Sequence, residues 1–410
     1  MTASLVDGPP GAGPGAGPGA SHRPDVPAEL LALLRRYAAQ VDRQARFPAE
    51  GLAALRNNGY LGYLVPAEYG GMGGDLGGLV SVAQALAGAC VSTAMIWAMH
   101  CQQVDVLVRH GGTRLRRRLL PQVAAGKVYL GSVTTESGKG GHLMSAREPL
   151  TAGDPADPAD DGKLVLRRHA PVCTGGAHAD GYLITMRADE ASAEHSVSLV
   201  YADRAELTVR PTGVWNPLGM RGTHSGPIHL SGLVDTDQIV GEPGHFREVA
   251  VDSMIPVGHL GWSACWLGAA RQAFADLVRH LARDGRTDLT SPLVRERIAR
   301  IRFDLDLVSA CLHRVREEMD TAREAGRRMD TPAAQIHVNT LKLAASELSF
   351  RAVDRMVQLA GLSLGYSGDS PIPLERTFRD LRSAALNYAN DRLWTANGAL
   401  ALLDRRVTLL

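Results

Sequence analysis

The spacing of apolar residues changes twice along this chain, and that change constrains the fold more than any other feature. Apolar residues recur at helical spacing between residues 28 and 128, and again from 249 to the end. Between these regions, short β-branched or alternating runs such as 164–166 and 196–201 are separated by turn residues. Because helices and strands are segregated, we expect an α+β fold with an N-terminal helical domain, a central β-barrel-like domain and a C-terminal four-helix bundle.

The same pattern predicts where the domains begin and end. Glycine, proline and alanine dominate the start of the chain and bury too little apolar surface to order it, so we expect a disordered tail there. The expected units are a disordered Gly/Pro tail over 1–26, the N-terminal helical domain over 27–130, the β-domain over 131–245 and the bundle over 246–410. The expected bundle helices are 258–283, 292–325, 331–362 and 374–403.

Charge and composition favour small-molecule chemistry. Lys+Arg number 44 and Asp+Glu 43, a formal charge of +1, so the chain lacks the basic excess that nucleic acid or an anionic membrane surface attracts. No apolar run approaches the ~20 residues that cross a bilayer. The five cysteines show no CxxC spacing, and we see no metal site. We therefore expect a cytoplasmic protein with no nucleic-acid or membrane partner.

Four motifs follow one another along the chain. They are Leu-Gly-Tyr-Leu-Val-Pro-Ala-Glu-Tyr-Gly-Gly at 61–71, Ser-Val-Thr-Thr-Glu-Ser-Gly-Lys-Gly-Gly at 132–141, Leu-Gly-Met-Arg-Gly-Thr at 218–223 and Leu-Glu-Arg-Thr-Phe-Arg-Asp at 374–380. In this order, and together with the α–β–α arrangement, they resemble the acyl-CoA dehydrogenase superfamily over about residues 27–403. The resemblance implies a flavoprotein oxidoreductase.

The resemblance also implies where a flavin would bind. Thr135 and the backbone of Val133 and Ser137 would bond the pyrimidine side of the ring, and Thr174 would face flavin N5. Donors at these places stabilise the negative charge of a reduced flavin. The cofactor implied is FAD, with FMN or a transiently bound reduced flavin as alternatives.

A second group of residues matches the family's contacts to the rest of the cofactor. Gln358 and Gly361 resemble a segment that packs on the FAD diphosphate across a subunit interface, which implies a homodimer or homotetramer. Arg283 and Arg286 could clamp a phosphate, although the family's Phe-Gly is missing beside them. The alternatives are a glycine that ends a helix and arginines on an exposed helix end.

The expected catalytic base is absent from both positions that the family uses. Dehydrogenation of an acyl thioester needs a group that removes the α-proton. One position falls on Asn387 and Tyr388, and the other on His259, which could instead be a core histidine. Asp391 lies one helical turn beyond Tyr388 and could supply a carboxylate, or could pair with Arg392.

Three functions remain open on this evidence. The first is α,β-dehydrogenation of a small or carrier-bound acyl thioester, with Tyr388, Asp391 and His259 as catalytic candidates. The second is a reduced-flavin monooxygenase, which needs no α-proton base and for which His142 and His100 are the candidate pocket histidines, His142 being the better one. The third is a flavoprotein subunit without catalysis. Candidate substrate contacts are His100, Gly141 and Asn387, and the redox partner would be a flavin reductase or an electron-transfer flavoprotein. We rank the dehydrogenase first because the flavin-loop residues match that branch better.

Overall fold

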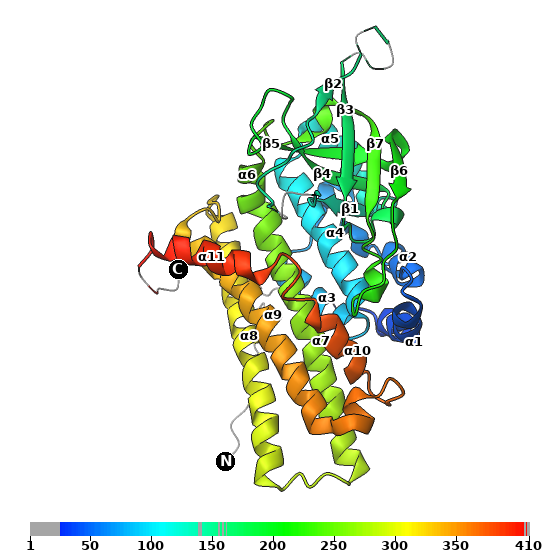
Figure 1. Ribbon diagram of the computed structural model, residues 1–410, viewed down its shortest axis with the longest axis vertical. Helices are drawn as coiled ribbons and strands as arrows, with labels where there is room; N and C mark the ends of the chain where they lie inside the picture. Colours follow the sequence, from blue (N-terminus) through cyan, green and yellow to red (C-terminus); the bar gives the residue numbers. More distant parts are fainter. Residues whose placement is uncertain are drawn as a thin grey trace, which may run out of the picture.

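The computed structural model describes residues 25–405 and 407, apart from 138–141, 155, 158, 159 and 161. Most of the predicted tail therefore lies outside the described residues. Figure 1 shows a β-domain at one end, a bundle of long helices at the other, and further helices packed against both. This is the predicted order of helical domain, sheet domain and helical domain.

The N-terminal domain surrounds one buried helix. Its helices are α1 (Ala28–Gln44), α2 (Ala49–Asn57), α3 (Leu76–Ala87), α4 (Val91–His110) and α5 (Thr113–Ala124). α3 begins where the Asp75 carboxylate accepts a hydrogen bond from the Gly78 N–H at 2.7 Å. α4 is buried along almost its whole length, as expected for a helix that is apolar on most faces.

The central domain consists of two four-stranded sheets. One has the order β1-β4-β5-β8 and the other β2-β3-β7-β6, and among these pairs only β1 and β4 run parallel. The strands are β1 (Leu130–Val133), β2 (Thr151–Ala152), β3 (Lys163–Ala170), β4 (Gly181–Arg187), β5 (Val197–Asp203), β6 (Leu207–Pro211), β7 (Ile228–Asp235) and β8 (Ile239–Val240). β4 and β5 are buried at nearly every residue, whereas β3 alternates, so the first sheet lies deeper.

The C-terminal domain is a bundle whose fourth helix is broken. Its helices are α6 (Phe246–Val249), α7 (Ile255–Asp284), α8 (Pro292–Glu324), α9 (Pro332–Gly361), α10 (Leu374–Arg382) and α11 (Asn390–Ala401), with π-helical turns at Ala250–Met254 and Leu362–Tyr366. Short 3-10 turns elsewhere cover Tyr60–Gly62, Ala67–Tyr69, Gly176–His178, Arg204–Glu206, Arg221–Thr223 and Thr236–Gln238. Each of α7, α8 and α9 has proline in its first turn, where no N–H is needed.

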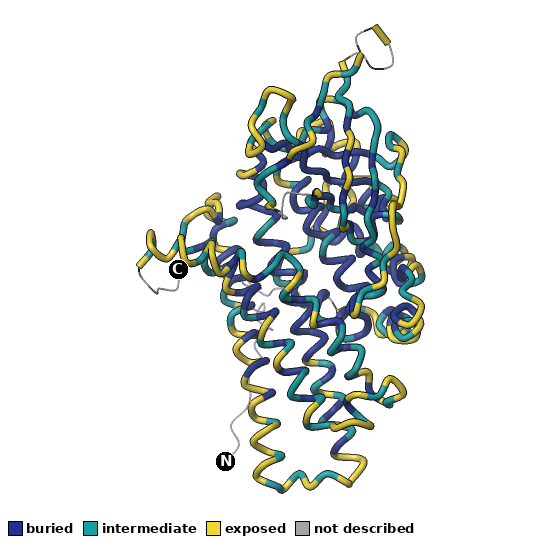
Figure 2. Tube along the Cα trace, viewed as in Figure 1, coloured by how far each residue is buried: buried dark blue, intermediate teal, exposed yellow. Residues whose placement is uncertain are grey.

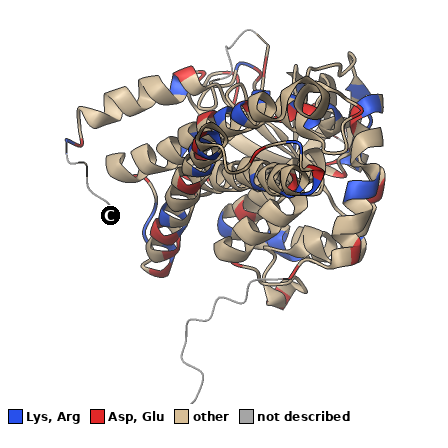
Figure 3. Cartoon of the chain, turned by 90° about the horizontal axis from the view of Figure 1, so that it is seen from below, with Lys and Arg blue, Asp and Glu red and all other residues tan. Residues whose placement is uncertain are grey.

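The core runs through the junction of the three domains. Figure 2 shows buried backbone continuing from the β-domain into α4 and the upper part of α7. Charged residues of both signs are interspersed along the helices (Figure 3), in keeping with the balanced composition. Among the described residues, no helix combines the length and the apolarity required to cross a membrane.

Candidate functional site

Two adjoining cavities lie where the domains meet. The first has a volume of about 300 Å³ and the second of about 440 Å³. Their shared wall comes from α4, the loops after β1 and β3, and the segment between α10 and α11. The residues that line both cavities are Met99, Thr135, Val172, Thr174, Leu386, Asn387 and Tyr388. Because the cavities share these residues, two ligands, one in each cavity, would lie close together, or one ligand could occupy parts of both.

The shared wall includes the break in the last long helix. The sequence pattern predicts one helix over 374–403, and this prediction is wrong, because residues 383–389 separate α10 from α11. Within the break, Tyr388 has a φ of 52°, a left-handed backbone conformation that is costly for any residue except glycine. Lys342 Nζ, on α9, donates hydrogen bonds to the Tyr388 carbonyl oxygen at 3.1 Å and to Asn390 Oδ1 at 2.6 Å. Hydrogen bonds from Lys342 of α9 therefore hold the end of the break against that helix.

Both threonines that the resemblance assigned to a flavin lie in the shared wall. Thr135 Oγ1 donates to the Val172 carbonyl oxygen at 2.7 Å. Thr174 Oγ1 lies 3.2 Å from Ser225 Oγ, which in turn lies 2.8 Å from Thr223 Oγ1. Their contact with a flavin stays a prediction.

The other two residues of the predicted flavin loop lie outside the cavity walls. Val133 is buried, and its carbonyl oxygen accepts from Thr185 Oγ1 at 3.4 Å, while Ser132 and Thr134 on either side line the first cavity. Ser137 is exposed, and its Oγ lies 3.1 Å from a ring nitrogen of His169. The residues of this loop that line the first cavity, Ser132 and Thr134, are thus sequence neighbours of the predicted Val133.

Glu136 anchors this loop, a role that the sequence analysis did not assign. Its buried carboxylate pairs with Arg168 of β3 at 2.9 Å and accepts the backbone N–H groups of Arg147 and Glu148, each at 2.9 Å. A buried carboxylate needs such partners because burial alone is costly for a charge. The anchored carboxylate places the two preceding threonines in the cavity wall.

His259 lines the first cavity from α7 and is fully buried. Its Nδ1 lies 3.3 Å from the Val338 carbonyl oxygen, so Nδ1 carries the proton and Nε2 is an acceptor. Burial, with a smaller effect of the Lys342 charge, lowers the pKa of His259 to about 3. The side chain is therefore a neutral imidazole, suited to accepting a hydrogen bond and weak as a base.

Tyr388 is the other predicted catalytic residue in the wall, and burial raises the pKa of its phenol, which disfavours a role as base. No aspartate or glutamate belongs to the described residues that line either cavity. Asn387, a predicted substrate contact, lines both cavities. The described walls thus offer hydrogen-bonding groups without a carboxylate.

His100 is a core residue rather than the substrate contact that we expected. Its Nε2 donates to the Leu61 carbonyl oxygen at 2.8 Å, and its Nδ1 accepts from the Leu130 N–H at 3.0 Å. Both ring nitrogens are occupied, and the side chain is fully buried without lining either cavity. Burial lowers its pKa to about 4, so the ring is neutral. His100 joins α4 to β1.

The remaining predicted contacts do not line the two cavities. Gly141 lies outside the described residues. His142 is exposed, although the next residue, Leu143, lines the first cavity. Asp391 is exposed in the first turn of α11. Neither His142 nor Asp391 is placed where a ligand in either cavity would meet it.

The residues predicted to contact the cofactor's diphosphate lie away from both cavities. Arg283 and Arg286 are exposed at the end of α7, and Gln358 and Gly361 are exposed at the end of α9. Both helices run from the site towards the far end of the bundle (Figure 1). Gly361 has a φ of 72°, so it also serves as a helix end. Their role in cofactor binding stays a prediction.

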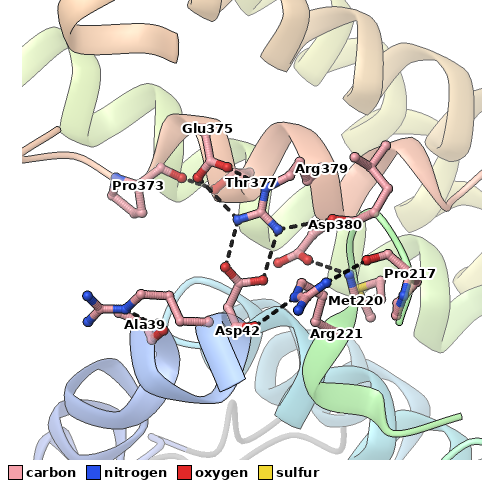
Figure 4. A network of polar contacts seen from close by, with 12 residues as sticks. Ala39, Asp42, Pro217, Met220, Arg221, Pro373, Glu375, Thr377, Arg379 and Asp380 are labelled. Carbon is pink, nitrogen blue, oxygen red and sulfur yellow. Dashed lines mark hydrogen bonds and ion pairs between the residues drawn. The ribbon is translucent and has the colours of Figure 1, made fainter. Parts of the chain in front are cut away.

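A polar network (Figure 4) includes Arg379 and Met220, which line the second cavity. Arg379 of α10 pairs with the Asp42 carboxylate of α1 at 2.6 and 2.9 Å, and also with Glu375. Asp380 Oδ1 accepts the Met220 N–H at 2.6 Å, and burial raises the pKa of this carboxyl to about 6. The network ties the N-terminal domain, the loop before β7 and α10 together around the site.

Three tryptophans of the site were missed. Trp262 lines the first cavity, while Trp215 and Trp266 line the second. Trp262 and Trp266 have buried Nε1 atoms without a hydrogen-bond partner in the described part of the chain. With His259 they follow the helical spacing of three and four residues, which puts them on one face of α7. That spacing is the signal that could have found them.

The geometry agrees with a comparison to known families. The N-terminal domain of acyl-CoA dehydrogenases matches residues 30–127, and the C-terminal domain matches residues 249–386. The chain belongs to the acyl-CoA dehydrogenase family, whose members are flavin-dependent oxidoreductases.

Individual relatives fall on both sides of the family's chemistry. A probable acyl-CoA dehydrogenase, fadE25, of Mycobacterium bovis is 28% identical over 51% of this chain and 52% of its own length. A dibenzothiophene monooxygenase of Rhodococcus qingshengii is 25% identical over 61% of this chain and 59% of its own. The alignments thus span little more than half of these relatives. FMN-bound TdsC of Paenibacillus sp. A11-2 has a similar fold, with a TM-score of 0.80, 20% identity and coverage of 93% of this chain and 97% of that one.

The residues present fit a flavin. A flat, largely apolar ring needs aromatic and apolar walls with a few placed donors. Trp215, Trp262, Trp266 and Met99 supply such walls, and the Thr174 hydroxyl is a polar group within them. Arg392 of the first cavity and Arg379 and Arg382 of the second are cationic side chains in these walls, whereas Arg283 and Arg286 lie away from both cavities. The fit concerns the flavin ring.

Proposed function

We propose that this protein is a flavin-dependent monooxygenase that inserts one oxygen atom into a small, largely apolar substrate. The observation that carries the proposal is the lack of a carboxylate among the described residues that line the two cavities. Abstraction of an α-proton from an acyl thioester needs a base, whereas oxygen transfer does not. A bound reduced flavin would supply the two electrons of this reaction, in which one atom of O₂ enters the substrate and the other leaves as water with two protons.

The wall residues have roles that suit this reaction. Met99 and Trp262 provide apolar contact and help to exclude water. His259 Nε2 would accept a hydrogen bond from an N–H or O–H group of the substrate, and the Thr174 hydroxyl would donate to the flavin. A separate flavin reductase would provide the reduced cofactor.

The second candidate is α,β-dehydrogenation of an acyl thioester, which the sequence analysis ranked first. The relationship to the probable acyl-CoA dehydrogenase supports it. Tyr388 would then have to act as the base, although burial raises the pKa of its phenol. A flavoprotein subunit without catalysis is the third candidate, and it would give neither reaction.

The proposal is tested by following heavy oxygen. TdsC has been crystallised with FMN and indole, and related proteins are named dibenzothiophene monooxygenases, so indole and dibenzothiophene are the first probes. The protein would be supplied with FMN or FAD, a flavin reductase and NADH under ¹⁸O₂. We expect a product that carries one heavy oxygen atom. Absence of labelled product, with hydride uptake from acyl-CoA instead, would contradict the proposal.

A further inference from the structure

A buried lysine stands behind the wall that the two cavities share. Lys342 lies in the middle of α9 with a relative exposure of 0% and lines neither cavity. Its ammonium group donates to the carbonyl oxygen of Tyr388 at 3.1 Å and to Asn390 Oδ1 at 2.6 Å. Tyr388 belongs to the break between α10 and α11 and Asn390 is the first residue of α11, so the side chain connects α9 to the end of this break.

The hydrogen bonds continue from Asn390 to the surface. Asn390 Nδ2 donates to Ser346 Oγ at 3.1 Å and to Glu347 Oε1 at 3.0 Å. Glu347 also accepts from the indole N–H of Trp394 at 3.2 Å. Each atom of the Asn390 amide thus has a partner, and the start of α11 is fixed against α9. The Lys342 ammonium lies 5.7 Å from the ring centre of Trp266, a residue of the second cavity.

Such a lysine is an expensive way to fill a helix bundle. Burial of an ammonium group costs free energy, and an apolar residue of similar volume is often as stable or more stable. The same segment also holds Tyr388 in the left-handed region, with a φ of 52°. Two unfavourable features therefore occur together where the chain forms the cavity wall, which is typical of a functional site.

We propose that Lys342 is a positioning residue of the flavin and substrate site. Its ammonium group binds the Tyr388 carbonyl oxygen and so stabilises the left-handed conformation of this residue. That conformation places Asn387 and the Tyr388 ring in the wall between the two cavities. Lys342 touches neither ligand. Its role is the same whether the reaction is an oxygenation or a dehydrogenation, so it extends beyond the proposed function.

The charged and titratable groups around Lys342 define its pH dependence. Burial lowers the pKa of Lys342 to about 8, and Glu347 on the same helix opposes this. From α7 it faces His259, which is neutral, and from the break it faces Tyr388, with Arg392 of α11 beyond. The ion pairs between α9 and α8 are made by other residues of α9, namely His337, Arg351 and Arg355.

The first test is Lys342→Met, with Lys127→Met as the control because Lys127 is exposed and outside the site. Flavin binding is measured with oxidised and reduced FMN through quenching of tryptophan fluorescence, alongside thermal unfolding. We expect Lys342→Met to weaken FMN binding about tenfold, since a hydrogen bond from a charged donor is lost. Its unfolding temperature should stay within a few degrees of the wild type, because removing a buried charge offsets the loss of the two hydrogen bonds. Unchanged binding, or a loss of binding that matches a loss of stability, would overturn the proposal.

The second test uses pH. As pH rises through about 8, Lys342 loses its proton and its bonds to the turn weaken, so FMN affinity of the wild type should fall. Lys342→Met should lack this fall. Asn390→Asp places a carboxylate beside the ammonium group, which raises the lysine pKa and should move the fall to higher pH. A fall that persists in Lys342→Met, or that Asn390→Asp does not move, would contradict the role of Lys342.

Discussion

His259 and His100 are both fully buried and neutral, yet they differ in whether both ring nitrogens have hydrogen-bond partners. His100 uses both ring nitrogens in hydrogen bonds to the backbone. His259 gives only its Nδ1 proton to a backbone carbonyl, and among the described residues its Nε2 has no protein partner. Because the His259 ring lines the first cavity, its Nε2 lone pair is available to a group that binds there. His259 is therefore the residue that we expect to select substrates with a hydrogen-bond donor.

Two probes that differ in one donor test this role. Indole has an N–H group, whereas dibenzothiophene has no donor. His259→Phe keeps a flat ring but removes the acceptor, so we expect indole turnover to fall about tenfold and dibenzothiophene turnover to change little. Product formation is measured for both substrates at matched enzyme concentrations. An equal loss for both probes would mean that His259 acts through packing alone.

The elements around the site depend on close backbone contacts. The loop at 217–220 lies against α10, and a Cβ on Gly219 would lie 1.9 Å from the Arg379 carbonyl oxygen. Asp380 accepts the next N–H of the same loop. Glycine is thus required by the approach of two backbones rather than by its own φ.

The matched substitutions Gly219→Ala and Gly226→Ala test this contact. Gly219→Ala must push the loop off α10, and we expect a loss of about 2 kcal/mol in the free energy of unfolding together with weaker FMN binding. Gly226→Ala adds the same methyl group where the nearest atom is 3.7 Å away, so it should stay within about 0.5 kcal/mol of the wild type. Chemical denaturation measures both, and a mild effect at Gly219 would show that the loop moves freely.

The same elements show what the sequence can and cannot predict. The helical period identified the long helices because each buries a stripe of apolar residues. It continued across 383–389, where no glycine or proline marks an end, so the break was missed. The break receives a hydrogen bond from Lys342, which is 46 residues from Tyr388 in the sequence. The family resemblance predicted the threonines and His259, whereas the tryptophans were not singled out, because they meet the other residues only through tertiary packing.

At the scale of the whole molecule, the three domains enclose the site jointly. α1, the loop before β7 and α10 are tied by the network around Arg379, and α4, the β-domain and the α10–α11 break form the shared wall. The fold is common to dehydrogenases and monooxygenases, so it leaves the reaction to the residues in the wall. In the described part of the chain, those residues include acceptors and donors but no carboxylate.

Anaerobic reduction of the bound flavin by acyl thioesters tests most directly whether the protein is a monooxygenase rather than a dehydrogenase. The flavin-loaded protein is mixed without oxygen with butyryl-CoA, isobutyryl-CoA and longer acyl-CoA thioesters, and the visible flavin absorbance is followed by stopped flow. A dehydrogenase bleaches its flavin in this experiment, because the substrate gives up a hydride. We predict that the absorbance stays constant with every thioester. Bleaching within the time of a single turnover would contradict the monooxygenase assignment and place the base on Tyr388 or on a residue outside the described walls.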